Sequence, residues 1–178
     1  IILPKAELTS DIEQVGHALT DIESRFGLPL GSLKILPLVE TCMGLRNTFD
    51  LASVSNRVCG MSLASAEQGD FMVDLGGHWT PSSMALAYPR SKMVVDARAA
   101  GVQWLVDGVF MNLKEIDKLR EECLIARELG FVFSGRDSRE NAEDLVFTSW
   151  RTDIDTINAG ADVIALTSLN EGTPVSLI

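Results

Sequence analysis

The sequence predicts an α/β fold in which helices cover a parallel sheet. Five short apolar runs with strand character alternate with longer segments of helical periodicity, an order typical of βα units. Two acidic residues, Glu40 and Asp70, follow consecutive apolar runs. Carboxylates at strand C-terminal ends favour a (β/α)8 barrel over an open doubly wound sheet, because the active sites of such barrels gather there. A complete barrel takes about 250 residues, so the 178 residues of this chain predict an incomplete one.

The predicted elements follow from apolar periodicity and from the residues that end helices. Strands are expected at residues 1–4, 33–39, 57–61, 102–110 and 131–133. Helices are expected at residues 11–26, 47–54, 84–100, 113–129, 138–147 and 153–166, with a long Gly- and Ser-rich loop at 65–83. The first helix has N-cap candidates at residues 9–11 and ends at Gly27. Pro89 is expected to bend or divide the third helix, which Gly101 ends.

Composition and charge exclude several classes of function. The formal net charge is −10, which disfavours nucleic-acid binding and offers no basic patch to an anionic membrane. No apolar run approaches the ~18 residues that a membrane span needs. The three cysteines lack zinc-like spacing, which favours reduced thiols and a cytoplasmic location. No G-x-G-x-x-G or Walker pattern follows an apolar run, so a nucleotide-binding sheet is disfavoured.

The ends of the sequence suggest its domain organisation. The chain starts Ile1-Ile2-Leu3 without a methionine and stops within an apolar run, so we expect it to be a piece of a longer protein. We expect residues 1–150 to form a partial barrel domain and residues 151–178 a C-terminal extension.

Glu40 and Asp70 are the candidate ligands of a hard divalent cation. Mg²⁺ takes one or two protein carboxylates and keeps its other positions for water and substrate. Each residue also has a structural alternative: Glu40 can cap the next helix or pair with a lysine, and Asp70 competes with Asp74 and Glu67 as the loop carboxylate. Lys5 is a candidate substrate contact or a Schiff-base lysine.

Six segments in order resemble the citrate lyase beta chain and malyl-CoA lyase group of aldolases over residues 1–150. They are ILPKAE, LVETCMGL, GDFMVDLGG, DARAAGVQWLVDGVF, ARELGFVFSGR and VFTSW. The resemblance implies a (β/α)8 barrel, usually a homotrimer, with Mg²⁺ held by Glu40 and Asp70. It also implies substrate contacts from Gly69 and Lys5. By the same resemblance the chain holds strands four to eight, and the family's catalytic arginine would lie upstream of Ile1.

The activity implied by the resemblance is Mg²⁺-dependent cleavage of a carbon–carbon bond in a 3-hydroxyacyl-CoA. A citryl-CoA or malyl-CoA type of substrate would give an acyl-CoA and an α-keto acid. Without the arginine, we expect this chain alone to be inactive. Arg46, Arg90 and Lys92 are candidate contacts for CoA phosphates, although such residues are usually surface charges. His78 is a loop residue that can approach the site as an acid.

Departures from the family pattern keep two alternatives open. The residue before Asp70 is Gly69 rather than Glu, and Ser134-Gly135-Arg136-Asp137 leads into a segment that lacks the family's His-Pro. One alternative is therefore a non-catalytic or assembly member of the family. The other is a Schiff-base aldolase that uses Lys5.

Overall fold

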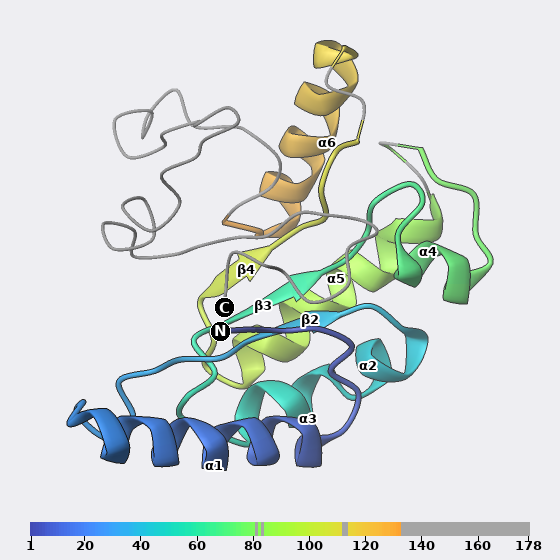
Figure 1. Cartoon of the computed structure of the whole chain (residues 1–178). Coiled ribbons are helices and arrows are strands. Elements are labelled where there is room, and N and C mark those ends of the chain that lie inside the picture. The colour runs from blue at the N-terminus through green and yellow to red at the C-terminus, as the bar shows by residue number, and fades with distance from the viewer. Residues whose placement is uncertain (81, 83, 112–113, 133–178) are drawn as a thin grey trace. The chain divides into compact units, whose positions relative to one another are not determined.

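Four parallel strands form the sheet of the computed structural model, which describes residues 1–80, 82, 84–111 and 114–132. All described residues belong to one compact unit of the chain. The strands are β1 (Ile2–Leu3), β2 (Leu36–Val39), β3 (Gly60–Leu63) and β4 (Trp104–Val106), in the order β1-β2-β3-β4 (Figure 1). Ile2 pairs with Leu36, and Ser62 pairs with both Leu38 and Val106. This confirms the predicted α/β fold with a parallel sheet.

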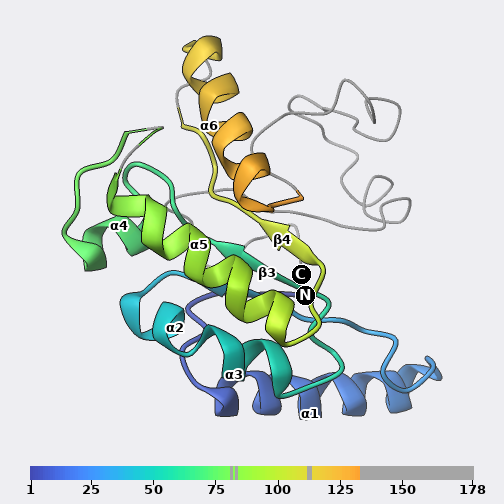
Figure 2. The ribbon, with the colours of Figure 1, turned by 180° about the vertical axis from the view of Figure 1, so that it is seen from behind.

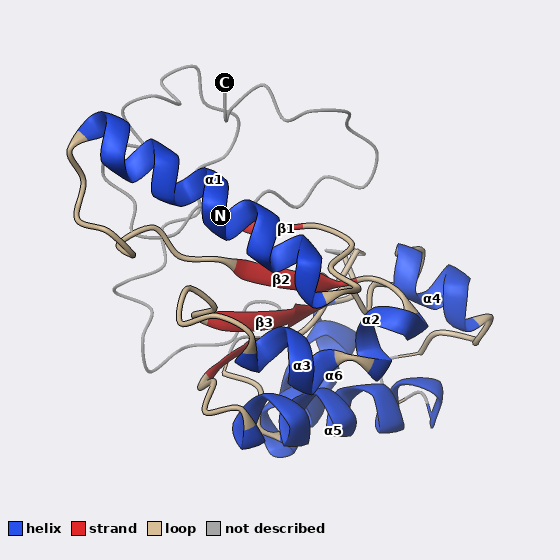
Figure 3. Cartoon of the chain, turned by 90° about the horizontal axis from the view of Figure 1, so that it is seen from below, coloured by secondary structure: helices blue, strands red, loops and turns tan. Residues whose placement is uncertain are grey.

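Helices connect the strands and cover one face of the sheet. The helices are α1 (Thr9–Phe26), α2 (Cys42–Arg46), α3 (Thr48–Ser53), α4 (Asp70–Leu75), α5 (Met84–Ala99) and α6 (Ile116–Leu129). Figure 2 shows α2, α3 and α5 in front of the strands, and Figure 3 shows α3 and α5 together on one side of the sheet. Helix α5 packs against both α3 and α6. The described part of the chain is therefore a βα series in which helical crossovers join parallel strands.

The core lies between the sheet and these helices. Along β2 the burial alternates, with Pro37 and Val39 buried and Leu36 and Leu38 half-buried, as the two-residue period of a strand requires. Strand β3 is buried throughout. The side chains that fill the core between sheet and helices are Ile35, Val39, Leu51, Met61, Leu63, Leu86, Met93 and Leu105, each with none of its surface exposed. Because Glu40 follows Val39, its alternation places it on the half-buried face with Leu36 and Leu38.

Several predicted boundaries are wrong. The predicted loop at 65–83 contains helix α4, and helix α2 lies where no element was predicted. Both are single short helices, below the length at which apolar periodicity is informative. The predicted strand at 102–110 is reduced to Trp104–Val106, because the chain leaves the sheet at Asp107. Pro89 does not divide α5, whose buried side includes Leu86 and Met93 on either side of it.

Two further predictions fall at the limit of the described residues. Phe131 and Val132 are not assigned to a strand. The Val132 N–H nevertheless donates to the Leu105 carbonyl over 3.0 Å, so this segment lies beside β4. Residue 133, the predicted helices at 138–147 and 153–166, and the predicted boundary at 150 lie outside the described residues.

A buried ion pair joins α1 to the chain segments that enter β2 and β3. The Glu23 carboxylate, with no exposed surface, accepts hydrogen bonds from both terminal nitrogens of Arg57, at 2.8 and 2.7 Å. It also accepts from the backbone N–H groups of Gly31 and Leu33, each over 2.8 Å. The hydrogen bonds from Arg57 hold the pKa of Glu23 far below its usual range, against the opposing effect of burial. Glu23 therefore anchors the loop between α1 and β2 through the backbone of Gly31 and Leu33.

We expect Glu23→Gln to lower the urea midpoint at neutral pH, because it leaves the half-buried Arg57 without its counter-charge. Glu13→Gln, an exposed position on the same helix, is the control and should leave the midpoint unchanged. Since the folded-state pKa is depressed, the stabilisation by Glu23 is present above the ordinary glutamate pKa of about 4.3 and is lost as the pH falls below it. The difference between wild type and Glu23→Gln should therefore shrink in acid, and a difference that grows there would contradict this account.

Candidate functional site

Parallel pairing brings the C-terminal ends of all four strands to one edge of the sheet. Polar residues occupy every one of these ends. They are Lys5 after β1, Glu40 after β2, Ser65 after β3 and Asp107 after β4. This edge is where sites gather in parallel α/β folds, because the loops that leave the strands meet there.

Glu40 comes directly from the end of a strand. It follows Val39 and is half-buried. One carboxylate oxygen, Oε2, accepts a hydrogen bond from the Lys5 backbone N–H over 3.0 Å. Burial raises the pKa of Glu40, the nearby charge of Asp70 raises it further, and the Lys5 hydrogen bond opposes both effects. A cation beside this carboxylate would relieve that unfavourable environment.

Asp70 lies at the same edge, in the segment between β3 and α5. The chain turns tightly at Gly69, the residue before the first residue of α4. A Cβ atom at Gly69 would lie 3.0 Å from the Ala64 carbonyl oxygen, so any larger residue would require the backbone of this turn to shift slightly. The Gly69 N–H donates to the Ala66 carbonyl over 2.9 Å and is engaged within the loop. Gly69 therefore shapes the turn that presents Asp70.

Lys5 contacts both acidic residues, which lie 30 residues apart in the sequence. Its backbone N–H binds Glu40, and its Nζ lies 2.7 Å from Asp70 Oδ2. The hydrogen bond and charge of Asp70 raise the pKa of Lys5. A Schiff-base lysine needs a lowered pKa so that its amine is a neutral nucleophile, and this geometry works in the opposite direction. We call Glu40 and Asp70 the carboxylate pair, and Lys5 is the lysine that contacts both of them.

The other candidate residues have different positions. Asp74 Oδ2 accepts the Cys42 N–H over 2.7 Å at the start of α2, and Glu67, His78 and Arg46 are exposed. Lys92 pairs with Asp96 one helical turn along α5. Arg90 is 1% exposed and bound to buried carboxylates, so its prediction as a CoA contact is wrong.

Arg90 belongs to a buried cluster at the end of β4 that sequence reasoning missed. Its Nη2 lies 2.8 Å from Asp107 Oδ2 and 2.7 Å from Glu122 Oε1. Asp107 Oδ1 accepts from the Ser65 hydroxyl over 2.7 Å, and that hydroxyl accepts the Gly108 N–H over 3.0 Å. The cluster fastens the loop after β3 to the end of β4. The sequence signal for this cluster was Asp107, an acidic residue directly after an apolar run, which is the same pattern that marks Glu40.

Trp79 anchors the C-terminal end of the segment that follows β3. Its indole N–H donates to the Ser65 carbonyl over 2.9 Å, and its ring packs against Phe110 with centroids 5.9 Å apart. The segment from Ser65 to Trp79, which carries Asp70, is therefore held at both of its ends.

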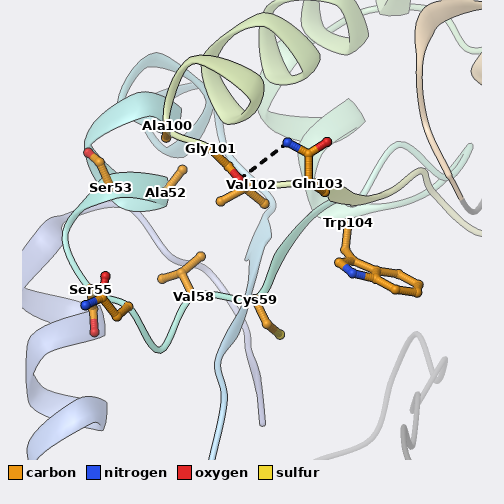
Figure 4. Close-up of a pocket in the computed structure, with 11 residues that line it drawn as sticks. Ala52, Ser53, Ser55, Val58, Cys59, Ala100, Gly101, Val102, Gln103 and Trp104 are labelled. Atoms are coloured by element: carbon orange, nitrogen blue, oxygen red, sulfur yellow. Dashed lines mark hydrogen bonds between the residues drawn. The ribbon is translucent and has the colours of Figure 1, made fainter.

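A cavity of about 390 Å³ lies at the opposite edge of the sheet (Figure 4). Its lining includes Val58 and Cys59 before β3 and Gly101 and Trp104 at the start of β4. These are the N-terminal ends of the strands, away from the carboxylate pair. The cavity therefore has no part in the candidate site.

The donor chemistry at the carboxylate pair fits a hard cation. Glu40 and Asp70 offer oxygen ligands, which Mg²⁺ prefers, and Mg²⁺ is usually held by one or two carboxylates with water and substrate completing its shell. Within the described residues no group of three or more His, Cys, Asp or Glu side chains is arranged to hold a metal. The pair is thus suited to Mg²⁺ shared with a substrate and unsuited to a closed protein cage.

These features define an α/β protein whose acidic residues gather at the C-terminal edge of a parallel sheet. The family model described as HpcH/HpaI aldolase/citrate lyase matches residues 1–134, and the chain belongs to this family.

Curated relatives agree with this assignment. Citrate lyase subunit beta of Leuconostoc mesenteroides subsp. cremoris is 34% identical over 131 residues, which are 74% of this chain and 42% of that protein. (3S)-malyl-CoA thioesterase of Cereibacter sphaeroides is 30% identical over 131 residues, or 74% of this chain and 40% of that protein. The chain thus spans less than half the length of these relatives.

Solved structures share the fold. RipC from Yersinia pestis gives a TM-score of 0.59 at 21% identity, covering 78% of this chain and 57% of that one. The citrate lyase beta subunit from Mycobacterium tuberculosis, complexed with oxaloacetate and magnesium, gives 0.56 at 22% identity, covering 76% and 55%. At these identities the similarity establishes the common α/β fold.

In the part of the chain that the structure describes, no helix is both long and apolar enough to cross a membrane. All three cysteines lie in that part, and no disulfide joins them.

The buried cluster generates a prediction about pH. Burial raises the pKa of Glu122 from 4.5 to about 7, the Asp107 charge adds to this and Arg90 opposes it. Because the folded-state pKa is raised, the stabilisation by protonated Glu122 is full below pH 4.5 and is lost as the pH rises through about 7. We expect Glu122→Gln, which keeps the neutral shape, to match wild type in urea unfolding at about pH 5 and to be more stable at about pH 8. Glu121→Gln, exposed on the same helix, should track wild type at both values, and equal pH profiles for all three proteins would contradict the assignment.

Proposed function

We propose that this chain carries the metal-binding part of a Mg²⁺-dependent carbon–carbon lyase. The proposed substrate is a 3-hydroxyacyl-CoA of the citryl-CoA or malyl-CoA type, and the products are an acyl-CoA and an α-keto acid. The observation that carries the proposal is the convergence of Glu40 and Asp70 on Lys5 at the C-terminal edge of the sheet.

Membership of the aldolase and citrate lyase family supports this proposal. Related structures support it too: one holds magnesium and oxaloacetate, and another, CitE from Mycobacterium tuberculosis, holds magnesium, acetoacetate and coenzyme A. We extend Mg²⁺, keto acids and CoA thioesters to this chain on that basis.

In the proposed reaction the bond between the hydroxyl-bearing carbon and the thioester α-carbon breaks. The hydroxyl loses its proton and becomes the keto oxygen, and the α-carbon takes up a proton to give the acyl-CoA. Glu40 and Asp70 would hold Mg²⁺ through carboxylate oxygens, and the bound ion would act as a Lewis acid toward the carbonyl oxygen. Lys5 would bind the carboxylate of the keto acid, and Gly69 would provide the tight turn next to the substrate.

The family resemblance also sets the proposed context of the chain. We propose that β1 to β4 are strands four to seven of a (β/α)8 barrel, with the eighth strand beginning near Phe131. The arginine that stabilises the acyl-CoA enolate would come from the third strand, so the chain by itself would bind metal and turn over no substrate. A cytoplasmic homo-oligomer, a trimer by resemblance, completes the proposal.

A second candidate is hydrolysis of the thioester, which the malyl-CoA thioesterase relatives favour. Hydrolysis of malyl-CoA would release malate and free CoA, whereas lyase cleavage gives acetyl-CoA and glyoxylate. A third candidate, a non-catalytic member of the family, would keep the carboxylate pair and give neither set of products.

The first test measures metal binding by the 178-residue chain with Mn²⁺ as a paramagnetic substitute for Mg²⁺. We expect Asp70→Asn and Glu40→Gln each to weaken Mn²⁺ binding by at least about 100-fold, since even outer-shell changes typically cost about 10–100-fold. The double variant should be little worse than either single one, because two ligands of one ion fail together. Asp74→Asn, on the same short helix, is the control and should bind Mn²⁺ as wild type does. Retention of Mn²⁺ affinity by Asp70→Asn would overturn the metal site.

The second test measures products in a chimera. In it this chain replaces the matching 42% of the Leuconostoc citrate lyase beta subunit, which supplies the upstream strands. We expect Mg²⁺-dependent release of acetyl-CoA from citryl-CoA or malyl-CoA, abolished by Asp70→Asn with the fold retained. Lys5→Ala should cost much less activity than Asp70→Asn, because the metal and not an imine polarises the carbonyl. Free CoA with malate would support the thioesterase, and a folded, metal-bound chimera without products would support the non-catalytic member.

A further inference from the structure

Lys5 has an unusual backbone conformation for its position between the two carboxylates. Its φ of 47° is the only positive value at a non-glycine residue within the described part of the chain. An unbranched L-residue adopts this left-handed region at a conformational penalty, so surrounding contacts must hold it there. Two such contacts are present, from the Lys5 backbone N–H to Glu40 and from its Nζ to Asp70.

The ion pair uses the same group that a metal would need. Lys5 Nζ lies 2.7 Å from Asp70 Oδ2, and the two side chains are 64% and 55% exposed. An exposed pair of this kind is weak and exchanges readily. An ammonium group and a dication bound to one carboxylate would repel each other over a few ångströms.

We propose that Lys5 and the divalent cation compete for the Asp70 carboxylate, so that metal binding releases the Lys5 ammonium to bind the carboxylate of the keto acid. This inference rests on the proposed metal site. This exchange would set the order of binding, because Lys5 can bind the anion only after the metal has displaced it from Asp70. Glu40 stays in place during the exchange, because its bond is to the Lys5 backbone and not to the side chain.

A different arrangement makes the opposite prediction. Asp70 has two oxygens, and Lys5 could stay on Oδ2 while the metal takes Oδ1. Lys5 would then support a metal ligand, and its loss would weaken metal binding by about 10-fold or more. The sign of the change in metal affinity therefore separates the two arrangements.

The experiment compares Mn²⁺ dissociation constants of the 178-residue chain measured by electron paramagnetic resonance. We expect Lys5→Met to bind Mn²⁺ about three- to ten-fold more tightly than wild type, because a competing charge is removed. Lys5→Gly should do the same, and since glycine adopts the left-handed region freely, it guards against a folding defect in the first variant. Lys5→Arg keeps the charge and should stay near wild type. Lys34→Met controls for net charge, because Lys34 is exposed and precedes the opposite end of β2.

A second measurement follows the released ammonium group with oxaloacetate as the probe. Calorimetry of the Mn²⁺-loaded chain should show oxaloacetate binding about ten-fold more weakly to Lys5→Met than to wild type, since a charge-assisted contact is lost. The same substitution thus strengthens metal binding and weakens anion binding.

Each outcome has a defined meaning. Tighter Mn²⁺ binding with weaker oxaloacetate binding supports the exchange. Weaker or unchanged Mn²⁺ binding by both Lys5→Met and Lys5→Gly overturns it and leaves the proposed metal site intact, provided that Asp70→Asn still abolishes Mn²⁺ binding. Absence of Mn²⁺ binding by the wild-type chain overturns the metal site and this inference together.

Discussion

Parallel pairing of the four strands is the constraint on which every other feature depends. The register of β1 on β2 and of β2 on β3 sends all strand C-terminal ends to one edge. Lys5 and Glu40 meet there because their strands are neighbours, although 35 residues separate them. Without this pairing neither residue would contact the other, and Asp70 would be one of several loop carboxylates.

The same edge holds charges in two different environments. The carboxylate pair and its lysine are half-buried or exposed, so their charges can be exchanged for those of a ligand. The Arg90, Asp107 and Glu122 side chains are buried, and Arg90 is bound to both carboxyl groups. Buried pairs of this kind resist rearrangement because separating them leaves an uncompensated charge. The buried cluster therefore holds the start of the segment that carries the exposed Asp70.

Sequence patterns predicted the elements that have strong periodicity or clear ends. Helix α1 with its Gly27 end and the βα alternation follow from local chemistry, and so does Glu40 after its apolar run. The patterns failed for α2 and α4, which are too short to show a period, and for Arg90. A basic residue on a helix is usually exposed, and only the packing of α5 against α6 and the contact of Arg90 with Asp107 bury this one.

The sequence by itself indicated the α/β class, the family and the two acidic residues that we propose as cation ligands. Those properties reside in short stretches whose residue types carry their own chemistry. Tertiary structure alone decided that Asp70 rather than Asp74 faces Lys5, that Lys5 takes a left-handed conformation and that burial raises the pKa of Glu122. Each of these depends on distances between residues far apart in the chain and on exclusion of water, and neither quantity is encoded in a local pattern.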